Sequence, residues 1–216
     1  MKEIDVKNWN RAKTYNWFKG FSNSTYCCNV RLDVTELVNH SKNNGQSFFI
    51  NMLYLVLKGL NSIEEMRMRM ENGVPVIYDD INPAFTVMTN AGTFENVRFN
   101  NCTNYNEFYK IASEKIEKAK NQVAIEEGEY NPSIYNEYYI SCVPWLDVVS
   151  LTQPIPDDIS SQCVPRICWG KFVDENGKYT MMLNITVSHI FVDGYPLSKT
   201  FMAIQENIKN SVDILK

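Results

Sequence analysis

Apolar and polar residues alternate in two segments of the chain. The alternation runs from Cys28 to Val34 and again from Phe85 to Thr89. A period of two places the apolar side chains on one face of an extended chain, so both segments are predicted to be strands with one buried face. Residues 130–139 are predicted to be irregular and to lead into a strand that ends at residue 143.

Apolar residues spaced three and four positions apart predict helices. Thr35 is placed to cap a first helix, a second spans residues 47–60, Asn104 is placed to cap a third that extends to Gln122, and a fourth begins after Pro196. In the last three helices the apolar residues share one face, which is typical of a helix packed on a core. These inward residues are Ile50, Leu53, Tyr54, Leu57, Phe108, Ile111, Ile116, Ala119, Leu197, Phe201, Ile204 and Ile208.

Residue pairs that favour turns separate the predicted strands. Asn-Gly at residues 72–73 precedes a strand over residues 74–78, and Asn-Pro at residues 82–83 joins that strand to the one over residues 85–89. Such closely spaced strands predict a meander.

A hairpin is predicted near the carboxyl end. Its arms are residues 166–173 and 178–188, and they flank an Asp-Glu-Asn-Gly turn at residues 174–177. The second arm leads directly into His189, and residues 151–163, before the first arm, are predicted to form a loop.

The order of these elements predicts the fold class. Strands and helices are intermixed along 216 residues, without an internal repeat or a linker that would divide them. A chain of this length buries about two-thirds of the surface that it exposes when unfolded. We therefore expect a single domain over residues 1–216, an α/β (α+β) two-layer sandwich in which helices pack on one mixed sheet.

Composition narrows the function classes. The net charge of −4 provides no excess of lysine and arginine for a nucleic acid, and the longest apolar stretch, residues 48–57, is too short to cross a membrane. The six cysteines form no C-x-x-C pair and the two histidines lie far apart, which argues against a bound metal. No basic and apolar leader precedes Asp5, so we expect a cytoplasmic protein with reduced thiols and a small-molecule partner.

His189 is the candidate for catalysis. It ends a predicted strand and is followed by the turn signal Asp193-Gly194. A neutral imidazole at a strand end can take a proton from a hydroxyl or a thiol, because the pKa of histidine lies near physiological pH. A histidine beside an apolar strand is also compatible with a structural role, and His-x-x-x-Asp-Gly alone does not decide between the two.

Seven further segments of the sequence carry a resemblance to a known family. Together with His189 to Gly194 the chain resembles the chloramphenicol acetyltransferase family from end to end. The matching segments, in chain order, are Trp9-Asn10-Arg11, Thr25-Tyr26 with Leu32-Asp33-Val34, Met66-Arg67-Met68-Arg69-Met70, Val76-Ile77-Tyr78-Asp79, Pro83-Ala84-Phe85-Thr86-Val87, Ser141-Cys142-Val143-Pro144-Trp145 and Gly170-Lys171-Phe172.

The resemblance implies an activity and a role for several residues. It implies direct transfer of acetyl from acetyl-CoA to an acceptor hydroxyl, with His189 as general base and Ser141 as the donor to the oxyanion. It also implies that Asp193 pairs with Arg11 and so supports the loop that holds His189. Because a buried charge that loses its partner is costly, such a pair fits a scaffold role.

The resemblance further implies the binding regions. The acceptor pocket would include Phe18, Ser24, Tyr26 and Cys168, and the CoA side would include Trp145 and Phe172. It implies a homotrimer in which His189 faces a pocket built largely by a neighbouring subunit.

The chain departs from the family pattern in the acceptor region. Ser188 replaces the first of two adjacent histidines, Ser24 replaces a pocket cysteine, Cys168 replaces a threonine, and residues 86–94 form a shortened version of the family's segment. Chloramphenicol is the expected acceptor, and antibiotic resistance the expected role. The alternatives are a related acyltransferase with a different hydroxyl or a dihydrolipoyl thiol as acceptor, and a catalytically silent ligand-binding protein.

Overall fold

The protein is built on a mixed seven-stranded sheet. The computed structural model describes residues 1–121 and 135–216. The strand order is β2-β10-β8-β7-β5-β6, with β9 paired to β10; β7 is parallel to β5 and β8, and the other neighbours are antiparallel. The strands are β2 (Thr25–Asp33), β5 (Asn82–Met88), β6 (Phe94–Arg98), β7 (Glu137–Val143), β8 (Arg166–Gly170), β9 (Val173–Glu175) and β10 (Lys178–Ser188).

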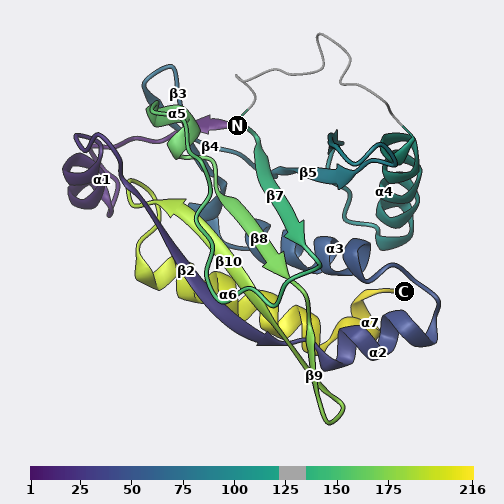
Figure 1. Cartoon of the computed structure of the whole chain (residues 1–216). Coiled ribbons are helices and arrows are strands. Elements are labelled where there is room, and N and C mark those ends of the chain that lie inside the picture. The colour runs from purple at the N-terminus through teal and green to yellow at the C-terminus, as the bar shows by residue number, and fades with distance from the viewer. Residues whose placement is uncertain (122–134) are drawn as a thin grey trace.

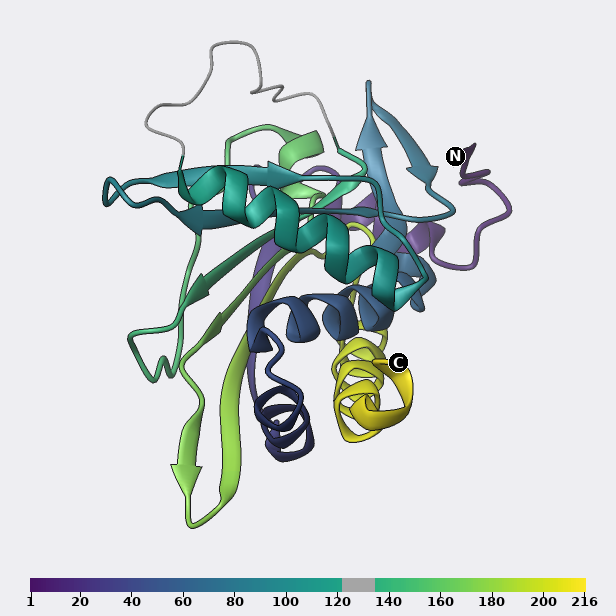
Figure 2. The same ribbon diagram turned by 90° about the vertical axis from the view of Figure 1, so that its right-hand side faces the viewer.

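Helices cover one face of this sheet, as Figures 1 and 2 show. Helix α3 is buried along most of its length, because α2, α4 and α6 pack around it. The predicted mixed sheet with helices packed on it is therefore confirmed, whereas the assignment of residues 1–216 to one domain stays a prediction. The covering helices are α2 (Thr35–Asn43), α3 (Phe48–Asn61), α4 (Tyr105–Lys120) and α6 (Gly194–Lys209).

Short elements complete the described chain. A small three-stranded sheet has the order β1-β4-β3, and three short helices and a 3-10 turn connect the larger elements. None of the described helices is long and apolar enough to span a membrane. The bounds are β1 (Lys2–Glu3), β3 (Met68–Glu71), β4 (Val74–Ile77), α1 (Ala12–Phe18), α5 (Ile159–Gln162), α7 (Ser211–Ile214) and η1 (Glu64–Arg67).

The two faces of the main sheet differ in polarity. One row of cross-strand partners contains Ile140, Ile167 and Ile185, which are buried in the core beneath the helices. The adjacent row contains Ser141, Cys168 and Asn184, and it lies on the other face because successive side chains of a strand point to opposite sides. The helix-free face is therefore the one that carries polar side chains.

The predicted meander is wrong. Strand β4 pairs with β1 and β3 in the small sheet, whereas β5 pairs with β6 and β7 in the main sheet. Asn82 and Pro83 do not form a turn, since β5 begins at Asn82 and its Pro83 lies opposite Tyr138. A proline is tolerated in the first positions of a strand, and its missing N–H does not break the sheet there.

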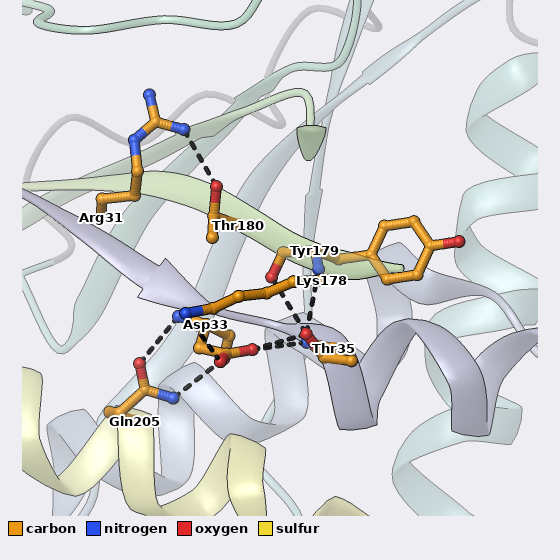
Figure 3. A network of polar contacts seen from close by, with 7 residues as sticks. All are labelled: Arg31, Asp33, Thr35, Lys178, Tyr179, Thr180 and Gln205. Carbon is orange, nitrogen blue, oxygen red and sulfur yellow. Dashed lines mark hydrogen bonds and ion pairs between the residues drawn. The ribbon is translucent and has the colours of Figure 1, made fainter. Parts of the chain in front are cut away.

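Thr35 does not cap α2 through its side chain. The cap residue is Val34, and no side chain accepts a capping hydrogen bond there. The Thr35 hydroxyl instead donates to Asp33 Oδ1 at 2.7 Å and accepts from the backbone N–H of Tyr179 at 2.9 Å (Figure 3). Gln205 of α6 also bonds the backbone of Asp33, so this network fixes two helices to the end of β2 (Figure 3).

Three smaller boundaries differ from the prediction. The expected loop over residues 151–163 contains α5, which Asp158 caps by accepting from the N–H of Ser161. The first hairpin arm is divided between β8 and β9. Asn104 caps α4 as predicted, but α4 ends at Lys120, and the predicted end at Gln122 and part of the irregular stretch at 130–139 lie outside the described residues.

Candidate active site

His189 follows the last residue of β10 at one end of the main sheet. Its backbone N–H donates to Ser24 O at 2.8 Å, which ties it to β2. The imidazole stacks on Phe18, with 3.9 Å between ring centroids and 17° between planes, and Tyr26 lies 5.0 Å away. Nδ1 is buried and has no hydrogen-bond partner among the described residues, while the side chain as a whole is partly exposed. Nε2 is therefore the ring nitrogen left to face a substrate.

The loop after His189 is held by side chains from distant parts of the sequence. Arg11 Nη2 donates to Asp193 Oδ2 at 2.7 Å, and Glu65 lies 3.8 Å from the same guanidinium group. Asp193 also accepts from the N–H of Tyr195 and thereby caps α6. The hydroxyl of Tyr26 donates to Val192 O at 3.2 Å. The pair expected between Arg11 and Asp193 is thus present in the geometry.

Two of the departures from the family pattern meet beneath His189. The side chains of Ser24 and Ser188 are both buried, and their hydroxyl oxygens lie 2.7 Å apart. The Ser24 N–H also donates to Gln162 of α5. The Ser24 hydroxyl is hydrogen-bonded to Ser188 within the chain. Its contact with an acceptor, expected from the sequence, stays a prediction.

Ser141 lies on the polar face of the sheet, in the centre of β7. Its Oγ is 3.4 Å from the hydroxyl of Thr86 on β5. Both line a cleft of about 220 Å³ whose other lining residues are Ala84, Phe85, Asn96, Arg98, Tyr139, Ile140 and Gln153. Cys168 lies opposite Ser141 on β8 and is 1 % exposed, and burial raises the pKa of its thiol to about 11.

Within one chain His189 and Ser141 are far apart. Ser141 is opposite Cys168, which is opposite Asn184, so two strand spacings of about 10 Å in total separate it from β10. His189 comes five residues after Asn184, about 17 Å farther along that strand. The two residues are therefore about 20 Å apart and cannot act on one atom within a single chain.

Trp145 and Phe172 lie beyond the carboxyl ends of β7 and β8, at the end of the sheet opposite His189. The backbone joins the two segments, since Lys171 N–H donates to Leu146 O at 2.8 Å. Trp145 is 63 % exposed, and Phe172 packs against Phe48 and Tyr179. The structure thus groups the residues expected on the CoA side, and it places them on the side of the molecule that holds Ser141.

The predicted site residues therefore form two groups. Phe18, Ser24 and Tyr26 surround His189, whereas Cys168 of the same predicted pocket accompanies Ser141. Sequence reasoning missed Thr86, Arg98 and Gln153, which line the cleft. The alternation in residues 85–89 places Thr86 on the face opposite Phe85, but only the register identifies its neighbours.

All six cysteines are free, and the described residues contain no cluster of three or more His, Cys, Asp or Glu side chains that could hold a metal ion. The arrangement supplies an imidazole in one group and, in the other group, a hydroxyl that lines a cleft.

Comparison with known proteins gives a consistent result. A family model described as chloramphenicol acetyltransferase matches residues 1–205. A chloramphenicol acetyltransferase of Proteus mirabilis is 28% identical over 94% of this chain and 92% of its own length, and one of Campylobacter coli is 25% identical over 94% and 96%. A solved chloramphenicol acetyltransferase superposes with a TM-score of 0.83 at 28% identity, over 100% of both chains. The dihydrolipoamide acetyltransferase of Azotobacter vinelandii shares the fold, with a TM-score of 0.63 at 15% identity over 95% of this chain and 89% of its own.

Proposed function

The chain belongs to the chloramphenicol acetyltransferase family and is an acyltransferase, and from this premise we propose that it acetylates a hydroxyl of chloramphenicol with acetyl-CoA as donor. Acetylation converts a hydroxyl of the antibiotic to an ester. The resistance role expected from the sequence follows from this modification. Acetyl-CoA acts as a co-substrate rather than as a resident cofactor.

In the proposed reaction His189 Nε2 removes the proton of the acceptor hydroxyl. The oxygen attacks the carbonyl carbon of the acetyl thioester, and the tetrahedral intermediate carries its negative charge on the former carbonyl oxygen. Collapse of the intermediate breaks the carbon–sulfur bond, and CoA leaves with the proton that His189 took. The partial exposure of His189, with Nδ1 buried, supports this role for Nε2, because a general base must reach the proton that it abstracts.

Ser141 is the proposed donor to the oxyanion. Its hydroxyl lines the cleft, 3.4 Å from the Thr86 hydroxyl, and either of these two oxygens can be the donor between them. A positioned donor of this kind is worth about 3 kcal/mol of transition-state stabilisation. Trp145 and Phe172 are proposed to contact CoA, and Phe18 and Tyr26 to form the wall of the acceptor pocket beside His189.

The proposal requires two copies of the chain at each site. The observation that carries it is the separation of about 20 Å between His189 and Ser141 within one chain. A ring of subunits solves this geometry, because each head-to-tail contact brings the His189 end of one copy to the Ser141 cleft of the next. The homotrimer expected from the sequence has this arrangement.

Release of CoA from acetyl-CoA tests the activity. We expect release with chloramphenicol and a loss of kcat of at least about 100-fold in His189→Ala, because general-base catalysis contributes about that much or more. His40→Gln, at the only other histidine, serves as control and should retain wild-type turnover. Equal turnover in His189→Ala would refute His189 as the base, and release with dihydrolipoamide alone would replace the hydroxyl by a thiol as acceptor.

A further inference from the structure

The cleft beside Ser141 owes its shape to one small side chain. On the polar face of the sheet Ala84 of β5 lies between Arg98 of β6 and Tyr139 of β7, its direct cross-strand partners. A methyl group between two long side chains leaves a hollow, and this hollow is part of the cleft of about 220 Å³. A volume below about 300 Å³ suits one group of a ligand rather than a whole drug-sized molecule.

Of the described residues that line this cleft, Arg98 is the one that carries a charge. Its Nε lies 3.5 Å from Oε1 of Glu137, and the Arg98 side chain is 30% exposed whereas that of Glu137 is 5% exposed. Neither Nη atom of Arg98 has a hydrogen-bond partner among the residues that the structure describes. Arg98 therefore offers its two Nη amino groups to a ligand, while its Nε faces Glu137.

Glu137 faces the Nε side of Arg98 and is almost fully buried. It does not line the cleft, and burial raises the pKa of its carboxyl group against the lowering effect of Arg98. Among the described residues, the rest of the polar lining comes from Asn96, Thr86 and Gln153, which are uncharged hydrogen-bonding groups. Apolar surface in the lining, against which a ring can pack, comes from Ala84, Phe85 and Ile140.

We propose that this cleft binds a carboxylate of the acceptor, held by the guanidinium fork of Arg98, so that the enzyme prefers hydroxyl acceptors that carry an anionic planar group. The fork of arginine matches two oxygens of one planar group, which makes the contact bidentate and directional. This inference rests on the proposed function, since Ser141 marks where the acetyl group is transferred.

The spacing between the two functional groups follows from the register. Arg98 and Ser141 are two strands and two residues apart, which places their Cα atoms about 12 Å from each other. Arg98 Nε lies beside Glu137, which is four residues from Ser141 along β7, so the Arg98 side chain leads away from Ser141. The span therefore leaves room for an aromatic ring between the carboxylate and the reacting centre. Chloramphenicol carries a nitro group on its ring, which is planar and has two oxygens but no net charge. It is therefore the neutral counterpart of the predicted ligand.

The test compares three acceptors that differ only at the ring substituent. Chloramphenicol, its analogue with carboxylate in place of nitro and its analogue with hydrogen in that position are assayed for kcat/KM by CoA release. The enzymes are the wild type, Arg98→Gln, Arg98→Lys and the double variant Arg98→Gln/Glu137→Gln. The double variant also removes the buried carboxylate that Arg98→Gln would leave without a partner. Lys118→Gln removes one exposed positive charge from α4, on the opposite face of the sheet, as control.

We expect the wild type to prefer the carboxylate analogue over the hydrogen analogue by at least about tenfold, as a single good ionic contact provides. Arg98→Gln and the double variant Arg98→Gln/Glu137→Gln should abolish this preference, with little change in kcat/KM for the hydrogen analogue. Arg98→Lys should keep part of it, and Lys118→Gln all of it. Equal use of the three acceptors by the wild type, or a preference that survives in the double variant, would overturn the inference and leave the proposed function intact. Release of CoA with none of the three would overturn both.

Discussion

At the scale of one residue, Arg11 acts on the site through its ion pair with Asp193. Its guanidinium group joins the start of α1 to the loop that carries His189, across 182 positions of sequence. Asp193 uses one oxygen for Arg11 and the other for the first turn of α6. Loss of Arg11 would free one oxygen and leave the other in place, so the loop would loosen without α6 losing its cap.

Arg11→Val is therefore expected to reduce both stability and turnover. The pair is only partly shielded, with 16% and 33% of the two side chains exposed. We expect a loss of about 1–3 kcal/mol, below that of a fully buried pair, together with a lower kcat. Urea denaturation and CoA release measure the two effects. Arg31→Val, at an exposed pair with Asp147, is the control, and unchanged values in Arg11→Val would show that the pair supports nothing.

At the scale of elements, the contact between α3 and α6 connects the core to the site. Gly59 of α3 faces Ile204 of α6, and a Cβ atom on Gly59 would lie 3.1 Å from the Ile204 backbone nitrogen and 3.2 Å from its Cα. These are backbone atoms, so a larger residue would displace α6 as a whole. Since α6 begins directly after the loop that carries His189, its position affects the loop as well.

Gly59→Ala tests this contact because two effects oppose each other. Alanine favours a helix over glycine by about 1 kcal/mol, whereas overpacking a tight core costs about 1–3 kcal/mol. We expect overpacking to prevail and the urea midpoint to fall. Lys58→Ala, at the adjacent exposed position of the same helix, should change stability by no more than about 0.5 kcal/mol. A midpoint equal to or above that of the wild type would contradict the tight contact.

Local periodicity explains which elements were predictable from the sequence. The helices α3, α4 and α6 and the strands β2 and β10 have patterns that depend on their own residues and on one buried face. The assignment of β4 and β5 to different sheets depends on distant partners, and no pattern at Pro83 encodes it. For the same reason Ser24 and Ser188 appear in the sequence as two unrelated departures from the family pattern. Their mutual hydrogen bond depends on the pairing of β2 with β10.

At the scale of the whole molecule, each half of the site has exposed apolar residues beside it. Trp17 and Phe21 near His189 are 65% and 48% exposed, and Trp145, Leu146 and Val149 on the proposed CoA side are 63%, 60% and 76% exposed. Apolar groups gathered on a surface mark interaction sites. A contact between the His189 end of one copy and the Ser141 side of the next would remove part of this surface from water.

The central claim is that His189 and Ser141 of different copies act on one acceptor. It is tested by unfolding His189→Ala and Ser141→Ala together, refolding the mixture and measuring CoA release with chloramphenicol. In a mixed ring a site is intact where the subunit that keeps His189 meets the one that keeps Ser141. Equal mixing thus predicts activity of about a quarter of that of refolded wild type, far above either variant alone. Activity no higher than the average of the two separately refolded variants would contradict a site shared between copies.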